Sequence, residues 1–165
     1  HVSSYGDLPM SPRVCLCLVS VLGFFAVMLG AFGAHGLKDT GYLERKYADM
    51  EPKNIAGFTV PASYKYFRDF ETGVEYHMTH TLAMAFTGLL MLRRPSTLLS
   101  IATWCFLVGI LFFSGSLYVL VIGGPRWLDI PWGMIAPIGG TLLLVGWLSL
   151  AAGSWNAASC QTNER

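Results

Sequence analysis

Charged residues are scarce in this sequence. Only 13% of its 165 residues are Asp, Glu, Lys or Arg, against about a quarter in an ordinary soluble domain. The segments 14–37, 95–125 and 130–163 contain no such residue. Each is longer than the ~20 residues that a helix needs to cross a bilayer, and a water-soluble fold could not bury three of them. The sequence therefore predicts a polytopic membrane protein.

Reaction and nucleic-acid motifs are also missing. The sequence contains no GxSxG, Walker, HExxH or CxxC pattern, which excludes the common hydrolase, nucleotide-binding, zinc-peptidase and dithiol sites. A formal net charge of +1 and the lack of a basic run argue against nucleic-acid binding. We therefore expect a protein that is not an enzyme, has no nucleic-acid partner and is surrounded by the lipid bilayer.

The hydropathy pattern predicts that the whole chain, residues 1–165, forms a single all-α membrane domain. The predicted architecture is a bundle of four transmembrane helices at about 14–36, 74–92, 97–122 and 131–153. Each is long enough to cross ~30 Å of hydrocarbon at 1.5 Å per residue. Four spans place both termini on one side of the membrane and bring the loops 38–73 and 123–130 together on the other.

The polar loop 38–73 joins the first two spans and is expected to be a partly helical hairpin. Pro61 can open a helix at its first position, and the aromatic spacing that follows predicts that the second helix begins before it enters the bilayer. Arg13 and the Arg93–Arg94 link favour cytoplasmic termini, whereas the six Lys and Arg residues of the loop favour the opposite orientation.

Polar side chains are expected to gather near one membrane face. Candidate members of this cluster are His35, His77, His80, Glu75, Ser114, Ser116 and Tyr118. Ionisable groups at membrane depth are costly and are candidates for function. Hydrogen bonding between helices explains them equally well. Three imidazoles are also compatible with a metal site, and a quinone or haem site stays open, so neither the metal nor any other cofactor is identified.

Small residues predict close helix packing. They recur every four residues in the first span as Ala26, Gly30 and Ala34 and in the fourth as Ala136 and Gly140, and Gly115 lies between two serines of the third. Such faces let helix backbones approach closely, within one chain or between chains. Pro137, followed by two glycines, predicts a kink in the fourth helix, and a transporter site can be built on such a break.

The motifs of the four spans resemble those of the transmembrane protein 256-like family, also called domain of unknown function 423. The resemblance rests on GAFGAHGL at 30–37, TGVEYHMTHTLAM at 72–84, GILFFSGSLYVL at 109–120 and IAPIGGTLLLVGW at 135–147. It implies a small four-helix protein of a bacterial inner membrane or an organellar inner membrane, without an established activity. This sequence departs from the pattern by an extra stretch, 48–60, and by Glu75 where the family pattern suggests glutamine.

Three functions are compatible with these features. The first is a non-catalytic accessory or scaffold subunit of a larger membrane complex, with a homo-oligomer as the other possible assembly. The second is a ligand-binding membrane protein that holds a metal, quinone or haem at the histidine cluster. The third is a transporter of a small solute or protons.

Overall fold

The computed structural model describes residues 10–162, with side chains through residue 155. The first helix, α1 (Pro12–Ala31), begins with a cap and a proline. The Val14 amide donates to Ser11 Oγ (3.3 Å), and Pro12 lies in the first turn, where a missing N–H leaves no bond unmade. The predicted span from residue 14 is therefore present and begins two residues earlier.

A π-helix, Phe32–Lys38, continues α1 without a break. Its turns contain more residues than α-helical turns, and this changes which side chains face inward. Gly33 and Leu37 are buried there, whereas Ala34 is exposed. Within the chain Gly33 rather than Ala34 therefore faces inward, and packing of the Ala26, Gly30 and Ala34 face between chains stays a prediction.

The polar loop contains a short helix, α2 (Tyr42–Lys46), and a two-stranded antiparallel sheet of β1 (Lys53–Ile55) and β2 (Phe58–Val60). The two-residue turn, Ala56–Gly57, has positive φ at both positions (49° and 86°), as a type I′ turn requires. An all-α fold was expected, so this β-hairpin corrects the prediction. It lies within the extra stretch 48–60.

The remaining helices follow the predicted order. They are α3 (Ala62–Arg93), α4 (Thr97–Ile122) and α5 (Ala136–Thr162), with short 3-10 turns at Trp127–Asp129 and Trp132–Met134. Pro61 caps α3 rather than entering it. The second helix begins well before residue 74, as predicted, and its start outside the bilayer stays a prediction.

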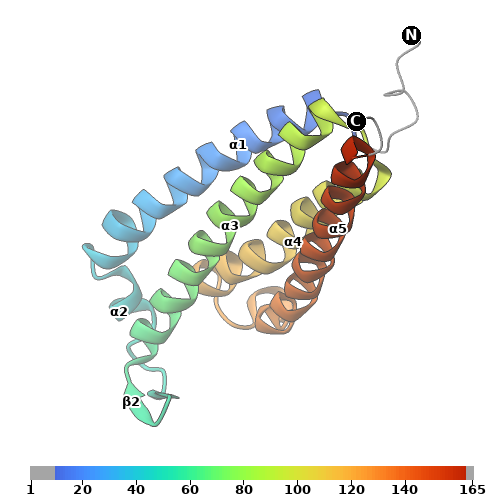
Figure 1. The fold of residues 1–165 in the computed structure, drawn as a ribbon. Coiled ribbons are helices and arrows are strands. Elements are labelled where there is room, and N and C mark those ends of the chain that lie inside the picture. Colours follow the sequence, from blue (N-terminus) through green and yellow to red (C-terminus); the bar gives the residue numbers. More distant parts are fainter. Residues whose placement is uncertain (1–9, 163–165) are drawn as a thin grey trace.

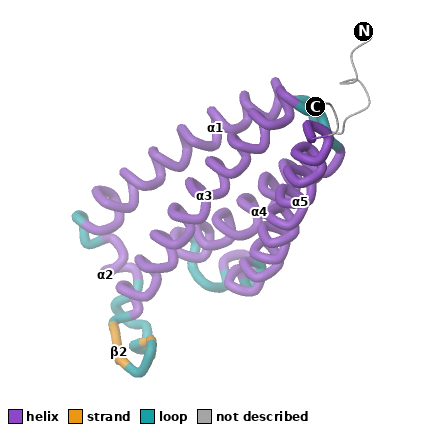
Figure 2. The backbone as a smooth tube through the Cα atoms, in the orientation of Figure 1, coloured by secondary structure: helices purple, strands orange, loops and turns teal. Residues whose placement is uncertain are grey.

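The long helices form an open row rather than a closed bundle (Figure 1). In this row α1 packs against α3, α3 against α4, and α4 against α5, while α3 and α5 barely touch and α1 and α5 have no packed interface. The smooth tube in Figure 2 shows the β-hairpin beyond one end of the row. A compact bundle would have closed α5 onto α1, so the expected bundle is corrected to an open arrangement.

Glycines set the spacing between α4 and α5. Three glycines of α5 follow one another at intervals of seven residues, and each faces α4. Gly139 faces the backbone at Phe113, whereas Gly146 faces the Phe106 ring and Gly153 faces the Leu99 side chain. Seven residues are about two helical turns, so the three contacts lie along one side of α5. A β-carbon on Gly139 would lie 2.3 Å from the Phe113 amide nitrogen, so this glycine lets the two backbones touch.

The polar loop closes the end of α4. The Lys46 ammonium donates to the Ile122 carbonyl (2.5 Å), and the Tyr47 hydroxyl donates to the Val121 carbonyl (2.9 Å). The last carbonyls of a helix have no partner within it and carry partial negative charge. These bonds therefore satisfy the end of α4 and confirm that the two loops share one end of the molecule.

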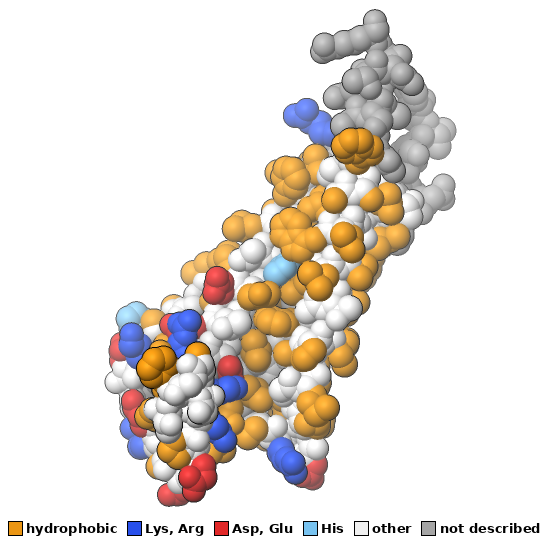
Figure 3. All heavy atoms as spheres, turned by 60° about the horizontal axis from the view of Figure 1, so that its bottom comes forward, with side chains coloured by type: hydrophobic (Ala, Val, Ile, Leu, Met, Phe, Trp, Pro, Cys, Tyr) orange, Lys and Arg blue, Asp and Glu red, His pale blue; other side chains and the backbone are white. Residues whose placement is uncertain are grey.

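Charged side chains gather at that same end, whereas the helices beyond it present mainly apolar side chains (Figure 3). Three helical segments of the described chain are long and apolar enough to span a membrane: Pro12–Lys38, Thr97–Ile122 and Trp132–Trp155. The predicted span 74–92 is not among them, because histidines and threonines lower the mean hydropathy of α3.

Candidate functional site

The three predicted histidines do not converge. His35 extends outward from the π-helix, with 81% of its side chain exposed, and its Nδ1 lies 3.0 Å from an Asp39 carboxylate oxygen. His77 and His80 are buried on α3. Among the described residues no group of three His, Cys, Asp or Glu side chains could hold a metal ion, so the structure does not form the three-histidine site considered from the sequence.

His77 links two helices at the centre of the row. Its Nδ1 forms a 3.3 Å hydrogen bond with the Tyr118 hydroxyl of α4, and its Nε2 is buried without a partner in the described structure. Ser116 is also buried but donates its proton to the Phe113 carbonyl of its own helix (2.9 Å). Ser114 is fully buried on α4. These residues lie inside the helix row, away from its surface.

His80 lies one turn further along α3 and faces a different environment. Its Nδ1 donates to the Tyr76 carbonyl (2.8 Å), which leaves Nε2 of the neutral ring as an acceptor. The ring lies among aromatic groups, with its centroid 5.9 Å from that of Phe106 and 6.1 Å from that of Trp147. His80 therefore reaches across α4 towards α5.

A groove of about 620 Å³ lies where α3 and α5 separate, and we take it as the candidate site. Its lining residues are Glu75, Tyr76, Thr79 and His80 of α3, Phe113 of α4, and Pro137, Gly140, Thr141, Leu143, Leu144 and Trp147 of α5. Small-molecule sites share this size and this mixture of apolar walls with a few polar groups. The groove exists because α4 contacts both neighbours, while α3 and α5 barely meet.

Glu75 stands at the charged end of this groove. Its side chain is exposed, and none of the ion pairs among the described residues includes it. Thr141 lies opposite on α5 and donates its hydroxyl proton to the Pro137 carbonyl (3.0 Å). The groove thus combines a carboxylate outside these ion pairs with the Thr141 hydroxyl, whose proton is already used, and the hydroxyl-bearing residues Tyr76 and Thr79 also line it.

Only some of the small residues predicted to pack helices together lie at contacts between helices. Ala26 is buried, and a β-carbon on Gly30 would contact Val74 of α3 at 3.5 Å. Ala136 is buried near the start of α5. A β-carbon on Gly115 would meet nothing within 4 Å, and one on Gly140 would only reach the Phe113 ring at 3.7 Å. Gly115 and Gly140 therefore do not bring helices together, and Gly140 lies in the groove instead.

Several groove residues were not singled out from the sequence. Thr79 follows Glu75 by one helical turn, and Thr141 precedes Trp147 by nearly two. A combined face of Glu75, Thr79 and His80 on one helix was a usable signal. No sequence signal could have indicated that α5 lines the groove, because this depends on the separation of α3 and α5 in the structure.

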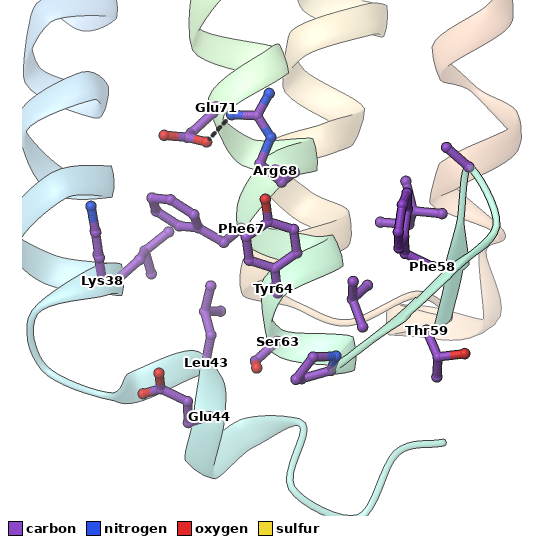
Figure 4. Close-up of a pocket in the computed structure, with 15 residues that line it drawn as sticks. Lys38, Leu43, Glu44, Phe58, Thr59, Ser63, Tyr64, Phe67, Arg68 and Glu71 are labelled. Carbon is purple, nitrogen blue, oxygen red and sulfur yellow. Dashed lines mark hydrogen bonds and ion pairs between the residues drawn. The ribbon is translucent and has the colours of Figure 1, made fainter. Parts of the chain in front are cut away.

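A second cavity, of about 1140 Å³, lies at the charged end between the β-hairpin and α3. Figure 4 shows Tyr64 of α3 in the centre, with Phe67, Lys38 and Leu43 on one side of it and Phe58 of β2 on the other. Arg68 pairs with Glu71 at its rim (2.6 Å). This cavity has an aromatic wall, with charges of both signs around it.

Comparisons with known proteins agree with this membrane architecture. The model of a family described as "Protein of unknown function (DUF423)" matches residues 29–140. A UPF0382 membrane protein of Haemophilus influenzae is 41% identical over 87% of this chain and 95% of its own length. The UPF0382 membrane protein YwdK of Bacillus subtilis is 34% identical, over 84% and 93%.

The name of a third relative states the membrane in which that relative is found. The UPF0382 inner membrane protein YgdD of Escherichia coli is 32% identical over 88% of this chain and 92% of its own length. No solved structure matches. The long apolar helices and these full-length similarities have one explanation: the chain is a membrane protein that belongs to the DUF423 (UPF0382) family, whose function is uncharacterised.

Proposed function

We propose that this chain is a non-catalytic membrane protein that binds an amphipathic ligand from the bilayer in the groove between α3 and α5. One observation carries the proposal: two ionisable residues, Glu75 and His80, line a mostly apolar groove on helices of a membrane protein. Such residues are costly at membrane depth and mark functional sites. A molecule with a polar head and an apolar body fits both parts of the groove.

The proposal includes four membrane spans, with 74–92 of α3 as the fourth. The distribution of polarity around α3 supports it. Thr81 and Thr87 are buried against neighbouring helices, whereas Leu82, Phe86 and Leu89 are 55–61% exposed. A helix that is polar inside and apolar outside is suited to lipid, since its buried hydroxyls can bond within the helix. Both threonine hydroxyls donate to carbonyls of their own helix.

The state of the serines supports a non-catalytic role. A nucleophilic serine needs a neighbouring base that accepts its proton. Ser116 donates instead to a carbonyl of its own helix, and none of the hydrogen bonds between described side chains joins a histidine to Ser114 or Ser116.

The test is native mass spectrometry of the protein extracted gently from its own membrane, together with two variants. Gly140→Leu fills the groove, whereas Gly115→Leu adds the same volume at a glycine with nothing within 4 Å of its missing β-carbon. We expect a small bound mass on the wild type and on Gly115→Leu that is lost from Gly140→Leu. Equal occupancy in both variants, or no bound mass on any form, would contradict ligand binding in the groove.

An accessory-subunit role is the second candidate, and the β-hairpin favours it. Phe58 is 74% exposed and Ile55 is 37% exposed at the charged end of the molecule, where an apolar surface is suited to contact with another protein. The same mass spectrometry tests this role. A mass above 18.1 kDa that resolves into other polypeptides and is lost on Phe58→Ser supports it, whereas a lone chain or a simple homo-oligomer opposes it.

A further inference from the structure

We infer that the groove between α3 and α5 recognises a protonated amine carried on an apolar chain, with the ammonium group held at Glu75. The inference rests on the proposed function and deepens it by naming the chemical class of the ligand. Three features of the groove carry it: an unpaired carboxylate, two further acceptors (His80 and Thr141) whose protons are committed to backbone carbonyls, and an aromatic and aliphatic floor.

Charge is the first feature. Glu75 is the only formally charged side chain among the described residues that line the groove. The preceding cations of α3 are already engaged, Lys65 with Asp69 and Arg68 with Glu71. The next cation on this helix, Arg93, is eighteen residues away, about 27 Å along the axis. Glu75 therefore lacks a cation of its own helix, and a cationic ligand supplies one.

Hydrogen-bonding capacity is the second feature. A carboxylate only accepts, and His80 and Thr141 have committed their protons to the Tyr76 and Pro137 carbonyls. All three residues thus offer lone pairs to the groove. An ammonium group has three donors and no acceptor, so it complements them. A quinone carbonyl only accepts, so it could bond to the Tyr76 and Thr79 hydroxyls of the groove but would leave the Glu75 carboxylate without a partner.

Shape and aromatic faces are the third feature. The Tyr76 and Phe113 rings stack with centroids 4.5 Å apart at the charged end, and aromatic faces attract cations. From there the groove follows α5 from Pro137 to Trp147, ten residues or about 15 Å. An apolar chain lying along Leu144 and Trp147 would point away from the charged end, as the tail of a bilayer amphiphile does.

Two sources present this chemistry, the headgroup of an aminophospholipid and a free long-chain amine. Both place a primary ammonium at the level of the lipid headgroups and an apolar chain below it. The recognition elements are the same for both, so the source is an outcome of the experiment.

The experiment uses three photoreactive probes with the same alkyl chain and an amine, an alcohol or a carboxylate at the end. The full-length protein is reconstituted in phosphatidylcholine vesicles, and labelled residues are mapped by mass spectrometry. Glu75→Gln removes the charge and keeps the side-chain shape. Glu71→Gln is the matched control, since this carboxylate lies one turn away, is paired with Arg68 and lines the other cavity.

We expect the amine probe to label groove residues of the wild type and of Glu71→Gln at least about tenfold more than those of Glu75→Gln, as for loss of a hydrogen bond to a charged group. Labelling by the alcohol probe should be weaker and unchanged by either substitution, which reports that the groove is intact. Glu75→Lys should transfer the preference to the carboxylate probe.

The two levels of the proposal fail differently. Equal labelling of the groove by amine and alcohol probes, insensitive to Glu75→Gln, would overturn the amine assignment and leave ligand binding standing. No labelling of the groove above that of the lipid-facing surface, with any probe, would overturn both. If phosphatidylethanolamine vesicles suppress amine labelling of the wild type, the ammonium comes from the lipid; if they do not, it comes from a free amine.

Discussion

Replacing Gly139 by alanine should separate α4 from α5. The added β-carbon would lie 2.3 Å from the Phe113 amide nitrogen and 2.8 Å from the Phe113 α-carbon. Ordinary van der Waals contact begins near 3.4 Å, so the helices must part by about 1 Å. Backbone atoms cannot move aside as a side chain can, and forced overpacking of this kind costs about 1–3 kcal/mol of unfolding free energy.

Gly140→Ala is the matched control because its β-carbon meets nothing closer than the Phe113 ring at 3.7 Å. Both substitutions replace glycine by a better helix former in the same turn, so their difference isolates the contact with α4. Reversible unfolding in mixed micelles measures both free energies. We expect Gly139→Ala to be the less stable by about 1–3 kcal/mol, and equal stability of the two would refute the reasoning.

Three further predictions concern other parts of the chain. Burial raises the pKa of Tyr47 above its ordinary value, so the stabilisation from its bond to α4 should be complete below pH ~10 and be lost as the pH rises above it. Burial raises the pKa of Tyr66 as well, so an unfolding series against pH should show a steeper decline in the wild type than in Tyr47→Phe. Gly88→Ala places a β-carbon 2.9 Å from the Cys15 sulfur and should destabilise the α1–α3 contact by about 1–3 kcal/mol in the same unfolding assay, whereas Gly115→Ala should lose nothing. Gly57→Val should weaken the hairpin, because φ is 86° there and a β-branched residue is strained at positive φ; faster proteolysis of the loop, with the unfolding of the helices unchanged, is the expected result.

The long helices were predictable because their signals are local. Charge-free runs, Pro61 and the Gly–Pro and Arg–Arg breaks appear in the printed sequence and mark most helix ends to within a few residues, whereas the fourth helix, predicted at 131–153, is observed at Ala136–Thr162. The β-hairpin was missed because each strand has only three residues, too few to show alternation. Its positive-φ turn at Ala56–Gly57 has one glycine and no Asn–Gly pair to announce it.

Two features could not be predicted from the sequence: which residues at the end of α1 face inward, and the open arrangement of the helices. No simple sequence pattern announces the change from α-helix to π-helix after Ala31. The predicted repeat of small residues every four positions was therefore extended to Ala34, although the residue buried within the chain is Gly33. Likewise, His80 and Glu75 were singled out as polar groups in an apolar region, but the groove depends on α5 remaining apart from α3. That separation depends on the three-dimensional packing of the helices. The structure also shows that His35 lies outside the site, because its side chain extends outward from the π-helix.

The bonds from Lys46 and Tyr47 to the carbonyls of α4 have a consequence for biosynthesis. The loop that carries them leaves the ribosome some seventy residues before the carbonyls that they bind. Until the end of α4 is made, the Lys46 ammonium can bond to the Tyr42 hydroxyl of its own loop (3.5 Å), but the carbonyls of α4 that Lys46 and Tyr47 bind do not yet exist. The loop therefore cannot complete its docking while α1 and α3 are the only long helices that have been made, and its protection from protease should mark the arrival of α4 during translation.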